Sequence, residues 1–143
     1  MEFSKQSHCV YYTRYHLVFV TKYRRKLLKH GMGAYVQVTM KAIGKHYPDI
    51  VIHEMNTDED HIHLLVSIPP KYSVSKAVNL LKSSSAHALR KKFPFINTMY
   101  EKEGLGLWST GYFVSTIGIN EDIIKKYIEH QGEEDRGQAK LVW

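Results

Sequence analysis

Two strand-like runs separated by only four polar residues constrain the fold of this chain more than any other feature. Residues 50–56 and 61–68 are rich in β-branched and apolar residues, and residues 57–60 between them form a short polar turn. A connection this short suits antiparallel neighbours, because parallel strands need a long crossover. The sequence therefore predicts a β-hairpin near the middle of the chain.

Strand-like and helical patterns also precede this hairpin. A strand is predicted at residues 15–21, where β-branched and aromatic residues are concentrated. A helix is predicted at residues 34–47, because apolar residues recur there at helical spacing and Pro48 follows. Two glycines, Gly31 and Gly33, are expected to break the chain before this helix.

The second half of the chain repeats this alternation. A long helix is predicted to begin at Ser73 or Ser75, either of which can cap it, and to stop before Pro94. A strand is predicted at residues 107–117. Asn120 is expected to cap a final helix, whose first turn is acidic.

The order of these elements indicates a fold class. Residues 95–106 are expected to be irregular, the following strand to bend at Gly111, and the last helix to end at Gly132. The order β-α-β-β-α-β-α is that of the split βαβ or ferredoxin-like pattern with an added C-terminal helix. We predict an α+β fold with one antiparallel sheet, two helices on one face and the other face left for a partner. Residues 1–143 are expected to form one domain.

Basic residues are concentrated in two segments of the chain. Residues 1–30 and 71–100 each carry a net charge of +6, whereas residues 31–70 and 101–143 each carry −3, which together give the total of +6. Separate basic blocks predict a polyanionic partner such as nucleic acid. An unevenly charged surface with no such partner is an equally good reading of charge alone.

Several classes of protein are excluded by what the chain lacks. One cysteine excludes an internal disulfide framework and a cysteine-rich zinc site. No apolar run approaches the roughly 18–20 residues of a membrane span, and the first residues lack the apolar core of a signal peptide. We expect a cytoplasmic protein with no membrane partner.

Two histidines on one predicted strand are candidates for a metal site. His61 and His63 lie two residues apart, so strand alternation places both imidazoles on one face and Ile62 on the other. Neutral imidazoles bind divalent cations, and the acidic residues 58–60 raise the local negative potential. The alternative is a pair of half-exposed histidines without a role.

A tyrosine and a glutamine on the last predicted helix form a second candidate site. Tyr127 and Gln131 lie four residues apart and so share a helical face. A tyrosine can attack a phosphodiester and become covalently attached to it, with help from a metal that Gln131 could ligate. The alternative is that Tyr127 only packs in the core beside Ile123 and Ile124.

Five short segments, in the order of the chain, carry a family resemblance. They are residues 16–25 (HLVFVTKYRR), 60–66 (DHIHLLV), 80–85 (LLKSSS), 107–109 with 111–113 (LWS and GYF) and 127–131 (YIEHQ). Together they resemble the HUH-type, single-tyrosine transposases of small bacterial and archaeal insertion sequences.

The resemblance implies a role for each matching residue. His61, His63 and Gln131 would be the metal ligands, and Tyr127 the nucleophile. The family binds single-stranded DNA with a hairpin near each element end, cuts one strand, holds a 5′-phosphotyrosine and rejoins the ends. The metal would be magnesium or manganese, and no nucleotide cofactor is needed. A homodimer is implied, with the tyrosine of one subunit serving the histidines of the other.

The residue types also suggest which side chains hold the DNA. Basic residues interleaved with aromatic ones offer phosphate contacts and stacking surfaces for unpaired bases. The predicted DNA contacts are Arg14, Lys22, Arg24, Arg25, Lys82, Ser83 and Arg90.

Other functions share some of these features. A non-catalytic module that binds single-stranded nucleic acid would use the basic blocks without the histidine, tyrosine and glutamine side chains. A relaxase-like or replication-initiation nuclease would share the chemistry, but commonly in longer chains with further domains. A domesticated relative of the transposases would share all of it, and the sequence does not separate that case.

Overall fold

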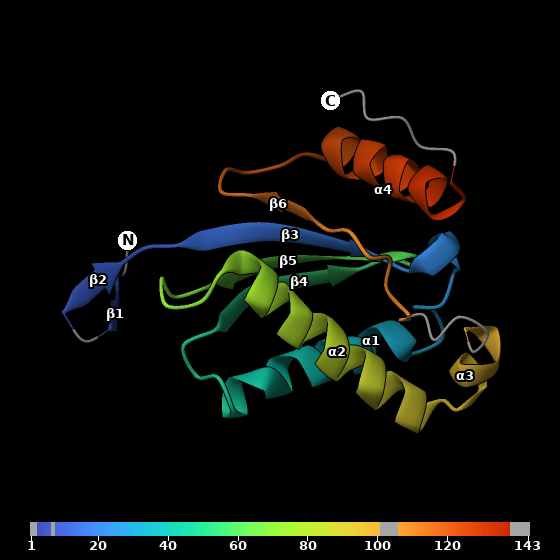
Figure 1. Ribbon diagram of the computed structural model, residues 1–143, viewed down its shortest axis with the longest axis horizontal. Helices are drawn as coiled ribbons and strands as arrows, with labels where there is room; N and C mark the ends of the chain where they lie inside the picture. The colour runs from blue at the N-terminus through green and yellow to red at the C-terminus, as the bar shows by residue number, and fades with distance from the viewer. Residues whose placement is uncertain (1–2, 7, 101–105, 138–143) are drawn as a thin grey trace.

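The computed structural model describes residues 3–6, 8–100 and 106–137, and it contains a four-stranded antiparallel sheet with helices on both faces (Figure 1). The strand order is β4-β5-β3-β6. The strands of this sheet are β3 (Arg14–Val20), β4 (Val51–Thr57), β5 (His61–Ser67) and β6 (Phe113–Ser115). The predicted α+β fold with an antiparallel sheet is therefore confirmed.

The hairpin predicted from the two central strand-like runs is confirmed. Strands β4 and β5 pair antiparallel, and the turn is closed by a hydrogen bond of 2.9 Å from the Asp58 amide to the His61 carbonyl. The register shifts between Ile52 and Glu54, where β4 bulges. Strand β5 lies between β4 and β3, so both its edges are paired and its side chains have fixed positions.

Two helices cover one face of the sheet, as expected. These are α1 (Met32–Lys41) and α2 (Val74–Lys92), which lie side by side below the sheet in Figure 1. Strand alternation directs Leu17, Phe19, Ile62 and Leu64 into this layer, and all four are fully buried. The cap of α2 is Ser73, whose hydroxyl accepts a hydrogen bond from the Lys76 amide.

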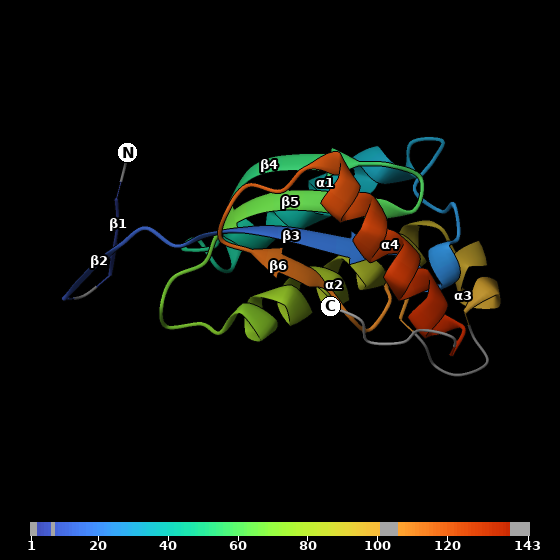
Figure 2. The ribbon, with the colours of Figure 1, turned by 90° about the horizontal axis from the view of Figure 1, so that it is seen from above.

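The last helix, α4 (Glu121–Asp135), lies on the opposite face of the sheet (Figure 2). Asn120 caps it as predicted, since its side chain accepts a hydrogen bond of 2.9 Å from the Ile123 amide. Val18 and Val20, which alternate with the residues of the main core, pack against apolar residues of this helix. The face that we expected to be left for a partner is thus partly covered by the chain's own helix.

Two predicted glycine breaks are wrong. Gly33 lies inside α1, where it is buried against Leu28 and Thr57, and only Gly31, with a φ of 89°, stands outside as the N-cap. Gly132 does not end α4, because the helix continues to Asp135 and Gly132 is buried in it. In both helices the glycine meets a close neighbour, so packing and not helix termination explains it.

Helix α1 is also shorter than the predicted 34–47. It ends at Lys41 and is followed by a 3-10 turn, η2 (Ala42–Lys45). The stretch 95–106, expected to be irregular, contains the short helix α3 (Phe95–Met99), and its residues 101–105 lie outside the described part of the chain.

The predicted strand at 107–117 is reduced to three residues in β6. Trp108 forms an isolated bridge to Thr21, and regular pairing with β3 resumes only at Phe113. Between these points the ammonium of Lys82 donates to the carbonyls of Ser109 and Gly111 at 2.7 and 2.8 Å. These carbonyls therefore bond a side chain instead of a neighbouring strand.

Two structural features had no counterpart in the sequence analysis. The strands β1 (Ser4–Gln6) and β2 (Cys9–Tyr11) pair only with each other, and they project beyond the end of the sheet in Figure 1. A 3-10 turn, η1 (Lys22–Arg24), follows β3 and packs against α4. Among the helices of the described residues, none is both long enough and apolar enough to span a membrane.

Candidate active site

Tyr127 and Gln131 lie one turn apart on α4, and both side chains point into the protein. The Tyr127 hydroxyl donates a hydrogen bond of 3.1 Å to Oε1 of Gln131. The two residues are only 6% and 4% exposed, respectively. The ring of Tyr127 packs against Phe113 of β6, with the ring centroids 5.7 Å apart.

Gly111 provides the space for this pair. A Cβ atom at position 111 would lie 2.5 Å from Oε1 of Gln131 and 3.3 Å from the Tyr127 hydroxyl. Real Cβ atoms do not approach other atoms so closely, so a side chain at position 111 would displace the Gln131 amide from its place beside Tyr127. The bend predicted at Gly111 therefore lies directly against the candidate nucleophile.

A buried carboxylate, Asp135, continues the same face of the helix. Its side chain is 1% exposed, and its Oδ1 accepts a hydrogen bond of 3.1 Å from Nε2 of Gln131. Its Oδ2 accepts bonds from the Ser109 hydroxyl at 2.6 Å and from the Tyr23 amide at 2.9 Å. The ammonium of Lys22 lies 3.5 Å from Oδ1. The carboxylate thus joins the end of α4 to η1 and to the segment before β6.

Sequence reasoning missed Asp135, although a signal was present. The residue lies four positions after Gln131 and eight after Tyr127, so all three share one helical face. The expected helix end at Gly132 placed Asp135 outside the helix and concealed that periodicity.

Burial sets the protonation of the tyrosine. Burial raises the pKa of the Tyr127 phenol far above its usual range, and the negative charge of Asp135 raises it further. The phenol is therefore neutral at physiological pH. As a nucleophile it would need a change in its surroundings that stabilises the phenolate.

The histidine pair lies on β5 and faces the α4 side of the sheet, while Ile62 between them is fully buried on the other side. Nδ1 of His61 lies 2.9 Å from Oδ1 of Asp60, and Arg24 lies 3.4 Å from the other carboxylate oxygen. The hydrogen bond to His61 is the main reason that the pKa of Asp60 is lowered. A carboxylate on Nδ1 leaves Nε2 of His61 with its lone pair available to a cation.

A third histidine, which sequence reasoning missed, contacts the pair. Nδ1 of His16 lies 3.1 Å from Nε2 of His63, because β3 and β5 pair in a register that sets the two residues diagonally. Burial lowers the pKa of His63, and the neighbouring His16 and His61 lower it further, against the opposing charge of Glu54 and Glu121. His63 is therefore a neutral imidazole at physiological pH. Finding His16 from sequence would have required the strand register.

The donor set fits a divalent cation in its chemistry. His61 and His63 offer imidazole nitrogens, and Gln131 offers a carbonyl oxygen. Across residues 3–6, 8–100 and 106–137, no three His, Cys, Asp or Glu side chains form a metal-binding group. Within the same residues, no hydrogen bond links the histidine pair to Tyr127 or Gln131. The structure places the two histidines on one face of β5 and the tyrosine and glutamine on one face of α4, but no hydrogen bond of the described residues connects these two pairs.

Three of the predicted DNA contacts are largely buried or face a carboxylate within the protein. Lys82 is largely buried, and burial lowers its pKa to about 8 although the charge of Asp135 opposes this effect. Lys22 faces Asp135, and the guanidinium of Arg24 faces Asp60.

The other four predicted contacts also have partners within the protein. They are Arg14 over the ring of Tyr12, Arg25 with the Met99 carbonyl, Ser83 with the Asn79 carbonyl and Arg90 with Asn97.

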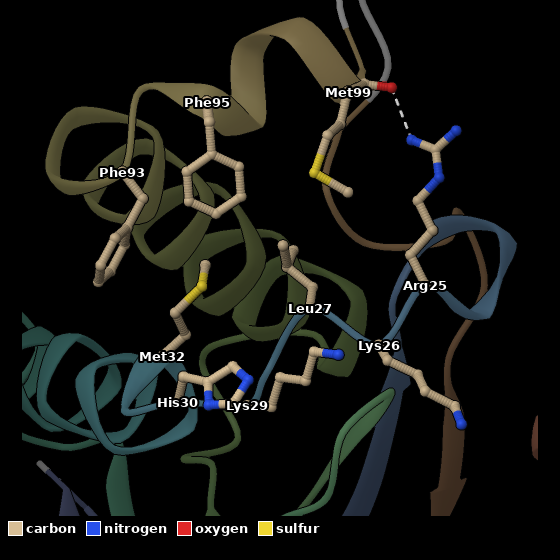
Figure 3. Close-up of a pocket in the computed structure, with 9 residues that line it drawn as sticks. All are labelled: Arg25, Lys26, Leu27, Lys29, His30, Met32, Phe93, Phe95 and Met99. Atoms are coloured by element: carbon tan, nitrogen blue, oxygen red, sulfur yellow. Dashed lines mark hydrogen bonds between the residues drawn. The ribbon is translucent and has the colours of Figure 1, made fainter.

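A concavity of about 750 Å³ lies between the segment after η1 and the junction of α2 and α3 (Figure 3). Its apolar lining is Leu27, Met32, Phe93, Phe95 and Met99, and its basic lining is Arg25, Lys26, Lys29 and His30. Figure 3 shows the two phenylalanine rings on one side and the basic side chains on the other. The lining contains no acidic residue, so the concavity suits an anion that also carries an apolar or aromatic group.

Comparisons with known proteins place the chain among related sequences. A family model described as "Transposase IS200 like" matches residues 9–131. The transposase for insertion sequence element IS200 from Salmonella typhimurium is 35% identical over 135 residues, 94% of this chain and 87% of the relative. The ISDra2 transposase TnpA from Deinococcus radiodurans is 29% identical over 136 residues, 94% of this chain and 95% of the relative.

Solved structures share the fold. The crystal structure of a putative transposase from Deinococcus radiodurans matches with a TM-score of 0.76 and 27% identity, covering 90% of this chain and 97% of the other. A REP-associated tyrosine transposase, solved bound to a REP hairpin, matches with a TM-score of 0.53 and 14% identity, covering 97% of this chain and 76% of the other.

Proposed function

This chain belongs to the IS200-like transposase family, and from that premise we propose that it cleaves and rejoins DNA strands with Tyr127 as the nucleophile. The observation that carries this proposal is the buried Tyr127–Gln131 pair at 3.1 Å, held on one helix face against Gly111. A buried phenol needs a hydrogen-bond partner, and here that partner is a carbonyl oxygen that a divalent metal could also bind.

The reaction exchanges one phosphodiester for another. The Tyr127 oxygen attacks the phosphorus and loses its proton, while the bond from phosphorus to the 3′ oxygen breaks and that oxygen takes up a proton. The products are a free 3′-hydroxyl and a 5′-phosphotyrosine. Attack by a 3′-hydroxyl on the phosphotyrosine reverses the exchange and rejoins strands. No nucleotide cofactor is consumed, because the phosphorus keeps the same number of ester bonds.

The side chains that would hold a divalent metal, magnesium or manganese, are His61, His63 and Gln131. Such an ion would neutralise charge that develops on the phosphate. The protein's own contribution is the orientation of these donors. Asp60 fixes the tautomer of His61, and the helix turn presents Oε1 of Gln131 beside the nucleophile.

The proposed substrate is single-stranded DNA that carries a hairpin. Arg25 and its basic neighbours at the concavity would hold phosphates, and its apolar floor would take an unpaired base. The segment between β3 and α1 supports this path, because Lys22 contacts the end of α4 while Arg25 lines the concavity. One strand could follow this segment from the tyrosine helix to the concavity.

A covalent adduct is the decisive test of this function. A hairpin-bearing single strand labelled at its 3′ end is incubated with the protein and magnesium or manganese, because the 3′ fragment is the one that stays on the tyrosine. We expect a labelled protein band that requires metal and is lost in Tyr127→Phe. Tyr47→Phe, which removes a hydroxyl from a tyrosine packed against Tyr72, is the matched control and should keep the band.

Binding without an adduct would contradict the proposal. If the protein binds the hairpin but forms no adduct with any divalent ion, it is a nucleic-acid-binding module and not a strand transferase. Loss of the band in Tyr47→Phe as well would show that the assay reports protein stability instead of nucleophilic attack.

A further inference from the structure

Asp135 is a buried carboxylate that the proposed reaction does not use directly. It lies at the end of α4 with a side chain 1% exposed, and it meets four partners from three segments of the chain. Burying a charge is costly unless hydrogen bonds compensate for it, so such a residue calls for an explanation. Its contact with Gln131 provides one.

The two ends of a glutamine amide are chemically opposite. Nε2 only donates hydrogen bonds, and Oε1 only accepts them. A carboxylate only accepts, so the end of Gln131 that faces Asp135 must be Nε2. The other end, Oε1, is then directed at the Tyr127 hydroxyl 3.1 Å away. The orientation of the amide thus depends on the carboxylate one turn further along the helix.

We propose that Asp135 is a positioning residue, whose carboxylate fixes the amide of Gln131 so that Oε1, and not Nε2, faces the reacting hydroxyl. This inference rests on the proposed function for its consequence in catalysis. An amide turned the other way would present a donor where the proposed metal needs an acceptor. Asp135 would touch neither DNA nor metal and would act only through Gln131.

The other contacts of Asp135 hold its carboxylate in place with both oxygens facing hydrogen-bond donors. Ser109 and the Tyr23 amide hold Oδ2, while Lys22 and Gln131 lie at Oδ1. The Tyr23 amide at Oδ2 and the Lys22 ammonium at Oδ1 can only donate, so both carboxylate oxygens must be acceptors. An asparagine at this position would have one acceptor oxygen for donors on two sides, and the Gln131 amide would lose its single orientation.

The test compares Asp135→Asn with Glu134→Gln, which removes the same charge from an exposed neighbour on the same helix. We expect Asp135→Asn to slow adduct formation by about 10- to 100-fold, as loss of an orienting partner typically does, with hairpin affinity unchanged. Glu134→Gln should match the parent protein. Equal adduct rates in the parent and Asp135→Asn would overturn the inference.

A double-mutant cycle separates positioning from a general structural effect. Gln131→Ala keeps both histidines, so its residual adduct is followed over long incubations at high metal concentration; if Asp135 acts through Gln131, then Asp135→Asn should not slow this residual rate any further. Losses that multiply would overturn the inference, because Asp135 would then act by another route.

A second measurement does not depend on activity. In the parent protein the side-chain amide protons of Gln131, assigned by their absence in Gln131→Ala, should exchange slowly with solvent in nuclear magnetic resonance spectra. Asp135→Asn should speed this exchange, and Glu134→Gln should not. Unchanged exchange in Asp135→Asn would overturn the inference.

Ser109→Ala replaces Asp135→Asn if the latter fails to fold. It removes the 2.6 Å hydrogen bond to Oδ2 but keeps the carboxylate. It should cause a smaller loss of adduct and a smaller increase in the exchange of the Gln131 amide protons, and a loss of adduct with unchanged exchange counts against the inference. A parent protein that forms no adduct would refute the proposed function, while the exchange measurement would still test the amide orientation.

Discussion

At the scale of single residues, the contacts around the candidate nucleophile keep its hydroxyl buried and protonated. The Tyr127 hydroxyl is buried, its oxygen faces Gln131, and burial together with the charge of Asp135 raises the pKa of the phenol. A neutral buried phenol cannot attack phosphorus. Catalysis therefore requires that substrate or metal change these surroundings before the proton leaves.

Lys82 provides a test of the electrostatics beside this site. Burial lowers its pKa from 10.5 to about 8, so between these two values the unfolded chain binds more protons than the folded one. Stability contributed by this group must therefore rise as the pH increases from about 8 towards 10. Below pH 8 the ammonium is charged in both states, and the cost of burying it is fully present.

The measurement is the thermal midpoint between pH 7 and 10 for the parent protein and Lys82→Met. We expect the midpoint of the parent to rise relative to that of the variant over this interval. Lys76→Met, on the exposed side of the same helix, should follow the parent curve. Parallel curves for the parent and Lys82→Met would show that the Lys82 pKa is not lowered.

At the scale of elements, two glycines in the first helical region should respond in opposite ways to the same substitution. A Cβ atom at Gly33 would lie 2.9 Å from Oγ1 of Thr57 and 3.0 Å from the Leu28 carbonyl oxygen, whereas at Gly44 it would meet nothing within 4 Å. Alanine is otherwise favoured over glycine in helices by about 1 kcal/mol.

We therefore expect Gly33→Ala to lower the free energy of unfolding by about 1–3 kcal/mol, the usual cost of overpacking. Gly44→Ala should leave it unchanged or raise it by a few tenths of a kcal/mol to about 1 kcal/mol, through reduced freedom of the unfolded chain. Urea unfolding of the two variants measures both effects. A stabilised Gly33→Ala would mean that α1 and β4 can move apart without cost.

The same elements show what the sequence could predict. Local patterns were sufficient for the central hairpin, for α2, whose cap they left between Ser73 and Ser75, and for α4 with its Asn120 cap, because each depends on residues close in the chain. The glycine errors have the opposite cause. Gly33 packs closely against Thr57, and Gly132 packs closely against Arg24. Because these neighbours are distant in sequence, no local pattern could reveal the contacts.

In the candidate site, too, neighbours close in the chain were predictable and neighbours distant in the chain were not. The spacing of His61 with His63 and of Tyr127 with Gln131 predicted each pair, since alternation and helical period fix such neighbours. The contact of His16 with His63 depends on the register of β3 and β5, which the sequence does not state. How the two pairs approach each other is a question of tertiary arrangement and stays a prediction.

At the scale of the whole molecule, α4 is the element whose position decides whether a site can form. It lies on the sheet face that also carries the histidines, and it reaches β6 through exposed residues such as Ile117 (74% exposed). Gly118 in this connection has open space around it. We propose that this connection can carry the tyrosine helix to a second copy of the chain, as the homodimer that the family resemblance implies would require.

Mixed dimers distinguish a site within one chain from a site shared between two. Tyr127→Phe lacks the nucleophile and His61→Ala lacks a proposed metal ligand, so each variant alone should form no adduct. In a co-expressed mixture, a shared site would pair the intact Tyr127 of one chain with the intact His61 of the other. We expect adduct formation to return, and only on the His61→Ala chain, which a size tag identifies.

If each site lies within one chain, every site in the mixture keeps one defect and no adduct can return. Capture of one tagged variant by the other shows that mixed dimers are present, so a missing adduct in captured material would contradict the shared site. As a matched control, Tyr127→Phe co-expressed with Tyr127→Phe,His61→Ala supplies no nucleophile and should stay inactive. An adduct on the Tyr127→Phe chain in any mixture would show that another residue attacks the DNA.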